Sequence, residues 1–278
     1  MIKIRKFVLL SIFFLFHSVL WSNGSVVINV FVHGTYPAKK LLDHKKSPVR
    51  HMIHAEHGLS LAKDLPKHYH FYQAAIGCDS YDSHQFDVNH FYTWGWHSSN
   101  VRPQHRCNEG KKLYESVNEL LQKHYILNQK ITVRFIGSSH GGNVVLNALQ
   151  WLPFDRHDVS VEVVLLGTPI QEHTRLFINC PYISKAYSYY STKDWIQRVD
   201  AQRFHKNSKK GVPFWSSRTF QDSDRVLQIE LKVNGKSISH GKYRRLFKHI
   251  PKMLCESDIL SMRTMSNHVH LNVSISDF

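Results

Sequence analysis

The sequence predicts an α/β protein with a doubly wound, mostly parallel sheet. Three apolar runs, at residues 26–32, 131–136 and 161–166, indicate buried strands, and each run ends in a glycine-containing turn. Apolar side chains at helical spacing lie between the runs. Long apolar strands joined through helices are typical of parallel sheets that are buried on both faces, whose functional groups gather at the carboxyl ends of the strands.

The segment after the first strand is the least regular. Residues 36–87 are polar, basic and rich in histidine, with a weakly helical pattern around Leu59 to Ala75. This is too long for a simple connection, so it predicts an insertion: either a lid or specificity element near the site, or a peripheral decoration. Residues 88–96 then predict an aromatic-rich strand, and apolar positions within 113–121 predict a helix. That helix leads back to the strand at 131–136 as a βαβ crossover.

The second half of the chain continues the alternation of strands and helices. Residues 187–190 predict an aromatic strand, and residues 227–233 alternate apolar and polar side chains as a half-buried strand does. An apolar helical face follows at 243–254. Asn234 and Gly235 form a strong hairpin signal, which predicts that the strand at 227–233 folds back on itself.

Ser139 is the residue that points most directly to chemistry. Residues 137–142 read Gly-Ser-Ser-His-Gly-Gly, a Gly-x-Ser-x-Gly sequence at the predicted junction of strand and helix. A serine in such a turn is held in a strained conformation, and small neighbours let the backbone close while the hydroxyl stays accessible. A glycine- and serine-rich loop can produce the motif by chance, but the strand–turn–helix context favours a nucleophile.

With these features the chain resembles the serine lipases and esterases of the α/β-hydrolase family, over roughly residues 26–255. The resemblance is carried by His-Gly-Thr at 33–35, by Gly-Ser-Ser-His-Gly-Gly-Asn at 137–143 and by Leu-Gly-Thr-Pro at 166–169. It implies a sheet of the α/β-hydrolase type with an insertion after the first core strand, and a nucleophile, an acid and a histidine in that chain order. It does not by itself name a substrate.

A nucleophilic serine needs a base that takes its proton during attack. His240 follows the last predicted strand and precedes the last predicted helix, which is the position that the family resemblance implies for the base. His249, His268 and His270 are the alternatives, because the hairpin signal allows the chain to turn away before His240.

The third member of such a triad is a carboxylate that orients the histidine. Asp194 lies at the end of the aromatic strand, where the resemblance places the acid, and Asp200 is the alternative. Either aspartate can instead cap a helix or turn, which is the usual role of a loop aspartate.

The resemblance also implies an oxyanion hole. One donor is the backbone N–H of His140, immediately after the nucleophile, and the other comes from Thr35 in the His-Gly-Thr turn. His33 is expected to brace this turn and not to transfer protons.

The bulk properties suit a single exported domain. A chain of 278 residues with 42% hydrophobic composition can bury one large core, which we assign to residues 25–278. Residues 1–24 carry three basic residues before an apolar stretch that is shorter than the ~20 residues of a spanning helix. This layout predicts a secretory signal peptide, with an uncleaved anchor as the alternative, and hence a secreted, periplasmic or cell-envelope protein.

The four cysteines fit an oxidising compartment, where disulfides persist. Of the three possible pairings we favour Cys78 with Cys107, because both flank one loop-rich segment. Four unpaired thiols are expected if the leader does not direct export.

The formal charge of +15 raises the question of anionic partners. The basic residues are scattered in short groups without a nucleic-acid-binding motif, so we expect no nucleic-acid partner. The two alternative interpretations of the charge are peripheral contact with an anionic membrane and a generally basic surface without such a partner. The 21 histidines include a run at His51, His54 and His57, but no His-Glu-x-x-His occurs, and we expect neither metal nor cofactor.

The sequence therefore predicts an exported serine hydrolase that cleaves carboxylic esters, with lipid-like acyl chains, through Ser139, His240 and Asp194. The main alternative is a catalytically silent hydrolase fold that serves as a binding or effector module at a membrane or host surface. A metallohydrolase is a more remote one.

Overall fold

The computed structural model describes residues 25–35, 57–98, 102–124, 130–156, 158–199, 220, 225–276 and 278. The predicted signal peptide at 1–24 lies outside these ranges, as does the first part of the predicted insertion, residues 36–56.

Within the described ranges, nine strands form one sheet in the order β2-β3-β1-β4-β5-β6-β7-β8, with β9 also paired to β7. Every pairing among β1, β3, β4, β5, β6, β7 and β9 is parallel, while β2 and β8 run antiparallel to their neighbours. The α/β class and the mostly parallel sheet are thus confirmed. The strands are β1 (Val26–Val32), β2 (Gly58–Leu61), β3 (Phe91–Gly95), β4 (Ile131–Ser138), β5 (Val159–Leu166), β6 (Ile183–Tyr190), β7 (Val226–Val233), β8 (Lys236–Ser237) and β9 (His268–Val273).

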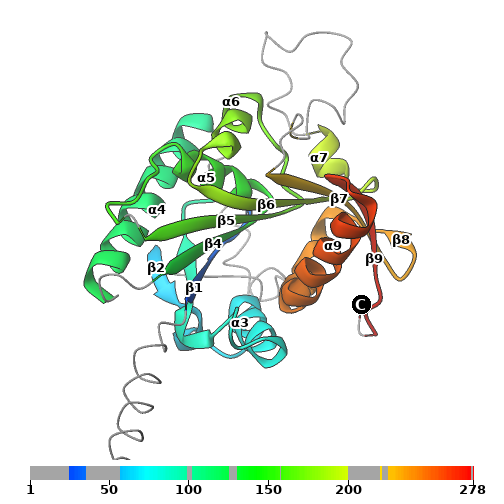
Figure 1. Ribbon diagram of the computed structural model, residues 1–278, viewed down its shortest axis with the longest axis horizontal. Coiled ribbons are helices and arrows are strands. Elements are labelled where there is room, and N and C mark those ends of the chain that lie inside the picture. The colour runs from blue at the N-terminus through cyan, green and yellow to red at the C-terminus, as the bar shows by residue number, and fades with distance from the viewer. Residues whose placement is uncertain are drawn as a thin grey trace, which may run out of the picture.

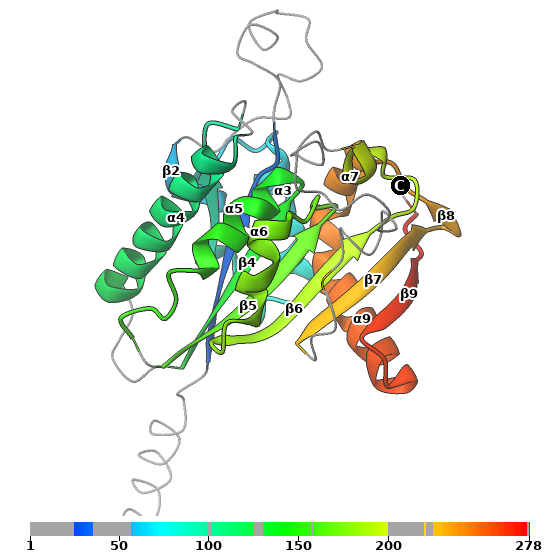
Figure 2. The same ribbon diagram turned by 90° about the horizontal axis from the view of Figure 1, so that it is seen from above.

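Helices cover both faces of the sheet. Figure 1 shows α4, α5 and α6 on one side and α3 and α9 on the other, and Figure 2 shows the same layers from above. The α-helices are α3 (His70–Tyr81), α4 (Pro103–His124), α5 (His140–Leu149), α6 (Glu172–Arg175), α7 (Trp195–Val199) and α9 (Ile250–Thr264), and the 3-10 segments are η2 (Ala62–Asp64), η3 (Val88–His90), η4 (Leu176–Asn179) and η6 (His240–His249).

The central strands have no solvent-facing side. Along β4, Val133 and Phe135 enter the core beneath α4 and α5, whereas Ile136 enters the core beneath α3 and α9. Because successive side chains of a strand point to opposite faces, a strand covered on both sides needs apolar residues at nearly every position. This explains the uninterrupted apolar runs in the sequence.

The register brings three loops to one edge of the sheet. Val32 at the end of β1 pairs with Gly137, and Ser138 at the end of β4 pairs with Leu166 at the end of β5. The turns that follow β1, β4 and β5 therefore meet at the carboxyl edge, where a parallel sheet presents its functional groups.

The described part of the predicted insertion is more regular than expected. Leu59 lies in β2, an edge strand antiparallel to β3, so the predicted helical pattern around Leu59 is wrong there, and the helix α3 begins only at His70. The strand predicted for 88–96 starts at Phe91, because Asp87 accepts the backbone N–H of Asn89 and caps the short η3. A lid role for this segment stays a prediction.

The predicted hairpin at Asn234 and Gly235 is confirmed, since both residues have positive φ and β8 pairs antiparallel with β7. Because β8 is only two residues long, the chain soon turns again and enters η6 at His240. The parallel edge strand β9 was not predicted. Its buried positions alternate with exposed ones, which is a strand signal in residues 268–273.

The predicted disulfide between Cys78 and Cys107 is wrong, because all four cysteines are free. Cys78 lies on α3 in the core beneath α3 and α9, whereas Cys107 lies on α4, which covers the opposite face. The sheet separates the two helices, so proximity in sequence did not translate into contact.

None of the described helices is both long enough and apolar enough to cross a membrane.

Candidate active site

Ser139 occupies a strained turn between β4 and α5. Its backbone has φ 51° and ψ −131°, a conformation that is rare for a residue with a side chain. Two hydrogen bonds hold it there: its N–H donates to the carbonyl of Leu166 at 2.9 Å, and its carbonyl accepts from the N–H of Gly142 at 3.0 Å. This strained strand–turn–helix junction, called the elbow below, is the one that the motif predicted.

The glycines around Ser139 are required by close approach. A Cβ on Gly137 would lie 2.5 Å from the Cα of Gly142, and one on Gly142 would lie 2.0 Å from the Oγ1 of Thr168. On the other side of the site, a Cβ on Gly34 would lie 2.8 Å from the Cβ of Ser139. At these three glycines, the elbow, the turn after β1 and the turn after β5 pack too tightly for a side chain.

His240 bridges Ser139 and Asp194. Its Nε2 lies 2.7 Å from the Oγ of Ser139, and its Nδ1 lies 2.8 Å from the Oδ2 of Asp194. A carboxylate only accepts hydrogen bonds, so Nδ1 carries the proton and donates to Asp194. In the neutral imidazole Nε2 is then an acceptor, and the Ser139 hydroxyl donates to it. The structure thus brings together the three side chains that the sequence singled out.

Asp194 is fully buried, and both of its carboxylate oxygens accept hydrogen bonds. While Oδ2 faces His240, Oδ1 accepts the backbone N–H of Gln197 in the first turn of α7 at 3.2 Å. The side chain of Gln197 in turn donates to the carbonyl of Thr168 at 3.1 Å. Helix α7 therefore fixes the carboxylate relative to the turn after β5.

Tyr243 packs behind His240. The two rings meet edge to face, with centroids 6.2 Å apart at 69°, and the tyrosine ring closes on Gly167, where a Cβ would lie 2.6 Å from its Cε2. Burial, and then the nearby charge of Asp194, raises the pKa of Tyr243 well above its ordinary value. The phenol therefore stays neutral and acts as an uncharged wall for the imidazole.

The turn predicted to supply an oxyanion donor is braced as expected. The Trp96 indole donates to the carbonyl of His33 at 2.8 Å. The His33 ring stacks on that indole, and its Nδ1 donates to the carbonyl of Gly34 at 2.8 Å. Thr35 follows this braced pair and is exposed, while His140 is the first residue of α5. Backbone N–H groups at a helix start have no acceptor one turn earlier in the helix, so the geometry suits donation to an anion.

The alternative bases occupy other positions in the fold. His268 and His270 are on the edge strand β9, where the Nε2 of His268 lies 2.8 Å from the Gln228 side chain and His270 pairs with Glu230 at 3.2 Å. His249 ends η6, and Asp200 lies outside the described residues.

Among the residues that the structure describes, no three or more His, Cys, Asp or Glu side chains are grouped so as to hold a metal ion. His51 and His54 of the histidine run lie outside those residues.

Two polar side chains at the site were not predicted from sequence. Arg106 of α4 lies 3.2 Å, through its Nη1, from the Nδ1 of His140, and its Nη2 donates to the Oε1 of Gln171 at 2.9 Å. Gln197, whose side chain donates to the carbonyl of Thr168, is the second polar side chain that was not predicted. A signal for Arg106 exists, because it lies two helical turns before Leu113 on the apolar face of α4.

No protein-family model matches the chain, and no curated protein sequence matches it.

Proposed function

We propose that this protein is a serine hydrolase of the α/β-hydrolase type that cleaves carboxylic esters through an acyl-enzyme. The observation that carries the proposal is the continuous hydrogen-bond path from Ser139 Oγ through both nitrogens of His240 to Asp194, with spacings of 2.7 Å and 2.8 Å. A serine, a histidine and a buried carboxylate in this order form the arrangement that activates a hydroxyl near neutral pH.

In the proposed reaction, Ser139 Oγ attacks the acyl carbon while its proton passes to His240 Nε2. The imidazolium formed is stabilised by the charge of Asp194. Collapse of the tetrahedral intermediate breaks the ester C–O bond, and His240 returns the proton to the departing alcohol. Water then attacks the acyl-enzyme with His240 as base, which releases the carboxylic acid and restores Ser139.

The negative oxygen of the intermediate needs donors that are already in place. We assign these to the backbone N–H groups of His140 and Thr35. Support comes from the contact of Gly34 with Ser139 and from the bracing of His33 by Trp96. Loss of one such donor typically slows an enzyme by about 10²-fold to 10³-fold.

We propose lipid-like esters as the substrate class and an exported location, on the strength of the family resemblance and of the leader-like residues 1–24. The basic charge of +15 is compatible with peripheral contact with an anionic membrane. The resemblance to lipases is an analogy, since amides and thioesters are cleaved by the same kind of site.

The competing proposal is a silent hydrolase fold whose charge and insertion serve binding. A binding module has no need of a strained serine, a buried aspartate and a histidine hydrogen-bonded to both. The intact contacts of His240 therefore favour the enzyme.

The test is covalent labelling with a fluorophosphonate, which reacts with activated serines. The mature protein, Ser139→Ala and His240→Ala are incubated with the probe, and adducts are located by peptide mass spectrometry. We expect one adduct, on Ser139, which is absent from both variants. Ser138→Ala is the matched control, because it removes the neighbouring hydroxyl and leaves the path to His240 intact.

Absence of labelling in folded wild-type protein would count against an activated serine and favour the binding module. If labelling occurs, hydrolysis of p-nitrophenyl esters of increasing chain length then tests the lipid-like preference, which a maximum at the acetate would contradict.

A further inference from the structure

Among the described residues, Arg106 is the most deeply buried charged side chain that the proposed mechanism does not use. It lies near the start of α4 with no solvent-exposed surface. Removing a guanidinium from water costs several kcal/mol unless its environment compensates. Such a residue on the buried face of a helix calls for a reason beyond packing.

The close approach of α4 to α5 places Arg106 behind the elbow. One turn after Arg106, a Cβ on Gly110 would lie 2.6 Å from the Cβ of Asn147 on α5. With the helices this close, the guanidinium reaches His140 at the start of α5 and Gln171 in the segment after β5. Arg106 thus links α4 to two of the segments that surround Ser139.

The chemistry of arginine fixes the protonation of His140. A guanidinium has only donors, so the contact of Nη1 with His140 Nδ1 requires that Nδ1 offers its lone pair. The proton of neutral His140 is therefore on Nε2. Protonation of Nδ1 would replace this hydrogen bond with a contact between two cations at 3.2 Å in a buried site.

We propose that Arg106 is a positioning residue for the oxyanion side of this site. It holds the His140 side chain in one neutral tautomer, and through it the backbone N–H that follows the nucleophile. Its fixed positive charge adds to that of the α5 N-terminus in favouring negative charge on the substrate oxygen. This inference rests on the proposed hydrolase function.

The first test reads the tautomer directly, without any reaction. In ¹⁵N NMR spectra of the wild-type protein, we expect His140 Nδ1 to be unprotonated and Nε2 to be protonated from about pH 5 to pH 8, the range in which an ordinary histidine titrates. A His140 that gains a second proton in this range, or that carries its proton on Nδ1, would overturn the proposal.

The second test compares Arg106→Met, which preserves length and loses the charge, with Arg106→Lys, which keeps the charge and one donor. In Arg106→Met we expect His140 to gain a second proton within this pH range. Fluorophosphonate labelling of Ser139 in this variant should be slower by up to about 10²-fold, as is usual when a catalytic group is misplaced. Arg106→Lys should recover part of the rate and suppress the titration.

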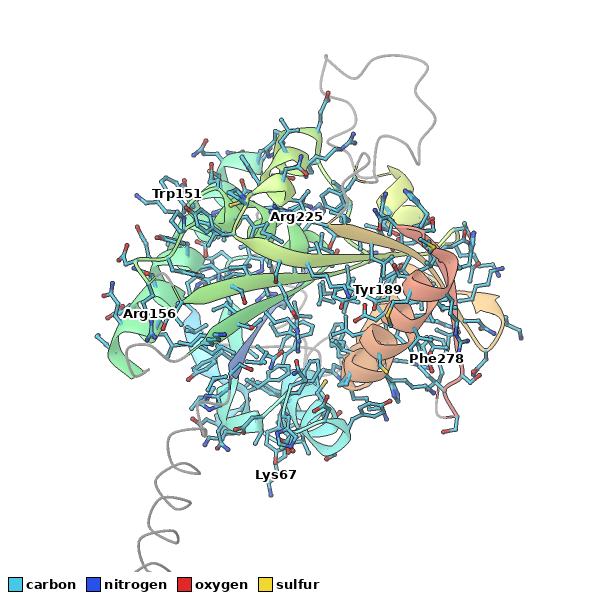
Figure 3. The ribbon with its side chains drawn as sticks, viewed as in Figure 1. Lys67, Trp151, Arg156, Tyr189, Arg225 and Phe278 are labelled. Atoms are coloured by element: carbon cyan, nitrogen blue, oxygen red, sulfur yellow. The ribbon has the colours of Figure 1, made fainter. Side chains whose placement is uncertain are left out.

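Arg156→Met is the matched control. Arg156 (Figure 3) is also a buried arginine and pairs with Asp158, but it lies just before the start of β5, which pairs with the start of β4, whereas Ser139 follows the end of β4. We expect it to lower stability and to leave the labelling rate per folded molecule unchanged. Equal labelling rates in Arg106→Met and wild type, with an unchanged His140 spectrum, would reduce Arg106 to a packing role.

The two tests also separate this inference from the proposed function. A wild-type protein that does not label would defeat the hydrolase proposal, whereas the ¹⁵N spectrum of His140 would still decide the arrangement with Arg106. If Arg106→Met does not fold, the wild-type spectrum and Arg106→Lys carry the test.

Discussion

Asp194 holds His240 with one carboxylate oxygen and the first turn of α7 with the other. Oδ2 accepts from His240 Nδ1 at 2.8 Å, and Oδ1 accepts the backbone N–H of Gln197 at 3.2 Å. The capping role and the histidine-orienting role, which were alternatives in the sequence, are thus filled by the same side chain. Because the cap fixes the carboxylate, the orientation of the imidazole is built into the fold.

We expect Asp194→Asn to separate these two roles. The amide oxygen can still accept from Gln197, so the helix cap and most of the stability are kept. The amide nitrogen, a donor, then faces His240 and favours the imidazole tautomer that cannot accept the Ser139 proton. Fluorophosphonate labelling and ester hydrolysis should fall by about 10²-fold to 10⁴-fold, with little change in melting temperature.

Asp87→Asn is the control for this substitution, because Asp87 caps η3 in the same manner just before the start of β3. Its activity should equal that of wild type. An Asp194→Asn protein with wild-type turnover would remove Asp194 from the catalytic path and leave it as a helix cap.

A second prediction concerns the tight packing beneath Ser139. In Gly137→Ala the new Cβ would meet the backbone of Gly142 at 2.5 Å, and backbone cannot move aside as a side-chain end can. We expect a loss of about 1–3 kcal/mol in the free energy of unfolding. Labelling per folded molecule should fall by up to about 10²-fold, because Ser139 is displaced.

Gly235→Ala provides the comparison. Its φ of +76° makes alanine unfavourable, by about 1–2 kcal/mol, but nothing lies within 4 Å of the added Cβ. Stability measured by urea unfolding should fall in both variants, whereas activity should fall in Gly137→Ala alone. If Gly235→Ala lost as much activity, the effect would have to be assigned to general destabilisation.

The proximity of Ser139, His240 and Asp194 was predictable where chain order and local pattern carry the information. The glycines around Ser139, between a predicted strand and a predicted helix, indicate this serine. The positions of His240 and Asp194 after predicted strands indicate these two residues. The hairpin at Asn234 argued against His240 as the partner of Ser139, because the chain could turn away before reaching it. Since β8 is only two residues long, the chain turns back and His240 does contact Ser139. The length of the returning strand of a hairpin depends on tertiary packing, which the turn residues alone do not determine.

Other features depend on which face of the sheet a helix covers. The periodicity of α3 and α4 indicates their apolar sides but not that the sheet lies between Cys78 and Cys107. For the same reason, the arginine on the apolar face of α4 could not be matched with His140 in advance. Only the approach of α4 to α5 at Gly110 brings the two together.

The cysteines give a third prediction, independent of catalysis. Cys255 is exposed, whereas Cys78 is buried, donates to the carbonyl of Phe247 at 3.2 Å, and has its pKa raised by burial. The thiolate is the reactive form, so Cys78 should be inert in the folded protein. With iodoacetamide and no reductant, we expect Cys255 to be alkylated first and Cys78 only after denaturation. A peptide that links Cys78 to Cys107 in a nonreduced digest would contradict the structure.

The last prediction concerns acid stability and His70, the first residue of α3. Burial, and then the charge of Arg244, lowers the pKa of His70 below the value of about 6.5 that is usual for a histidine. The start of a helix also disfavours a cation. Between the lowered pKa and about 6.5, the unfolded chain binds the proton and the folded protein does not, so the free energy of unfolding rises with pH in this window. Acidification from pH ~7.5 to ~5.5 should therefore destabilise the protein through this residue.

Urea unfolding at a series of pH values measures this slope. His70→Gln cannot take up the proton, so its unfolding free energy should depend less on pH between about 5.5 and 6.5 than that of wild type. His84→Gln, at an exposed loop position, is the matched control for the loss of one histidine side chain. A His70→Gln profile that runs parallel to wild type would show that the acid sensitivity arises elsewhere, since a group that does not change its proton affinity on folding contributes no slope.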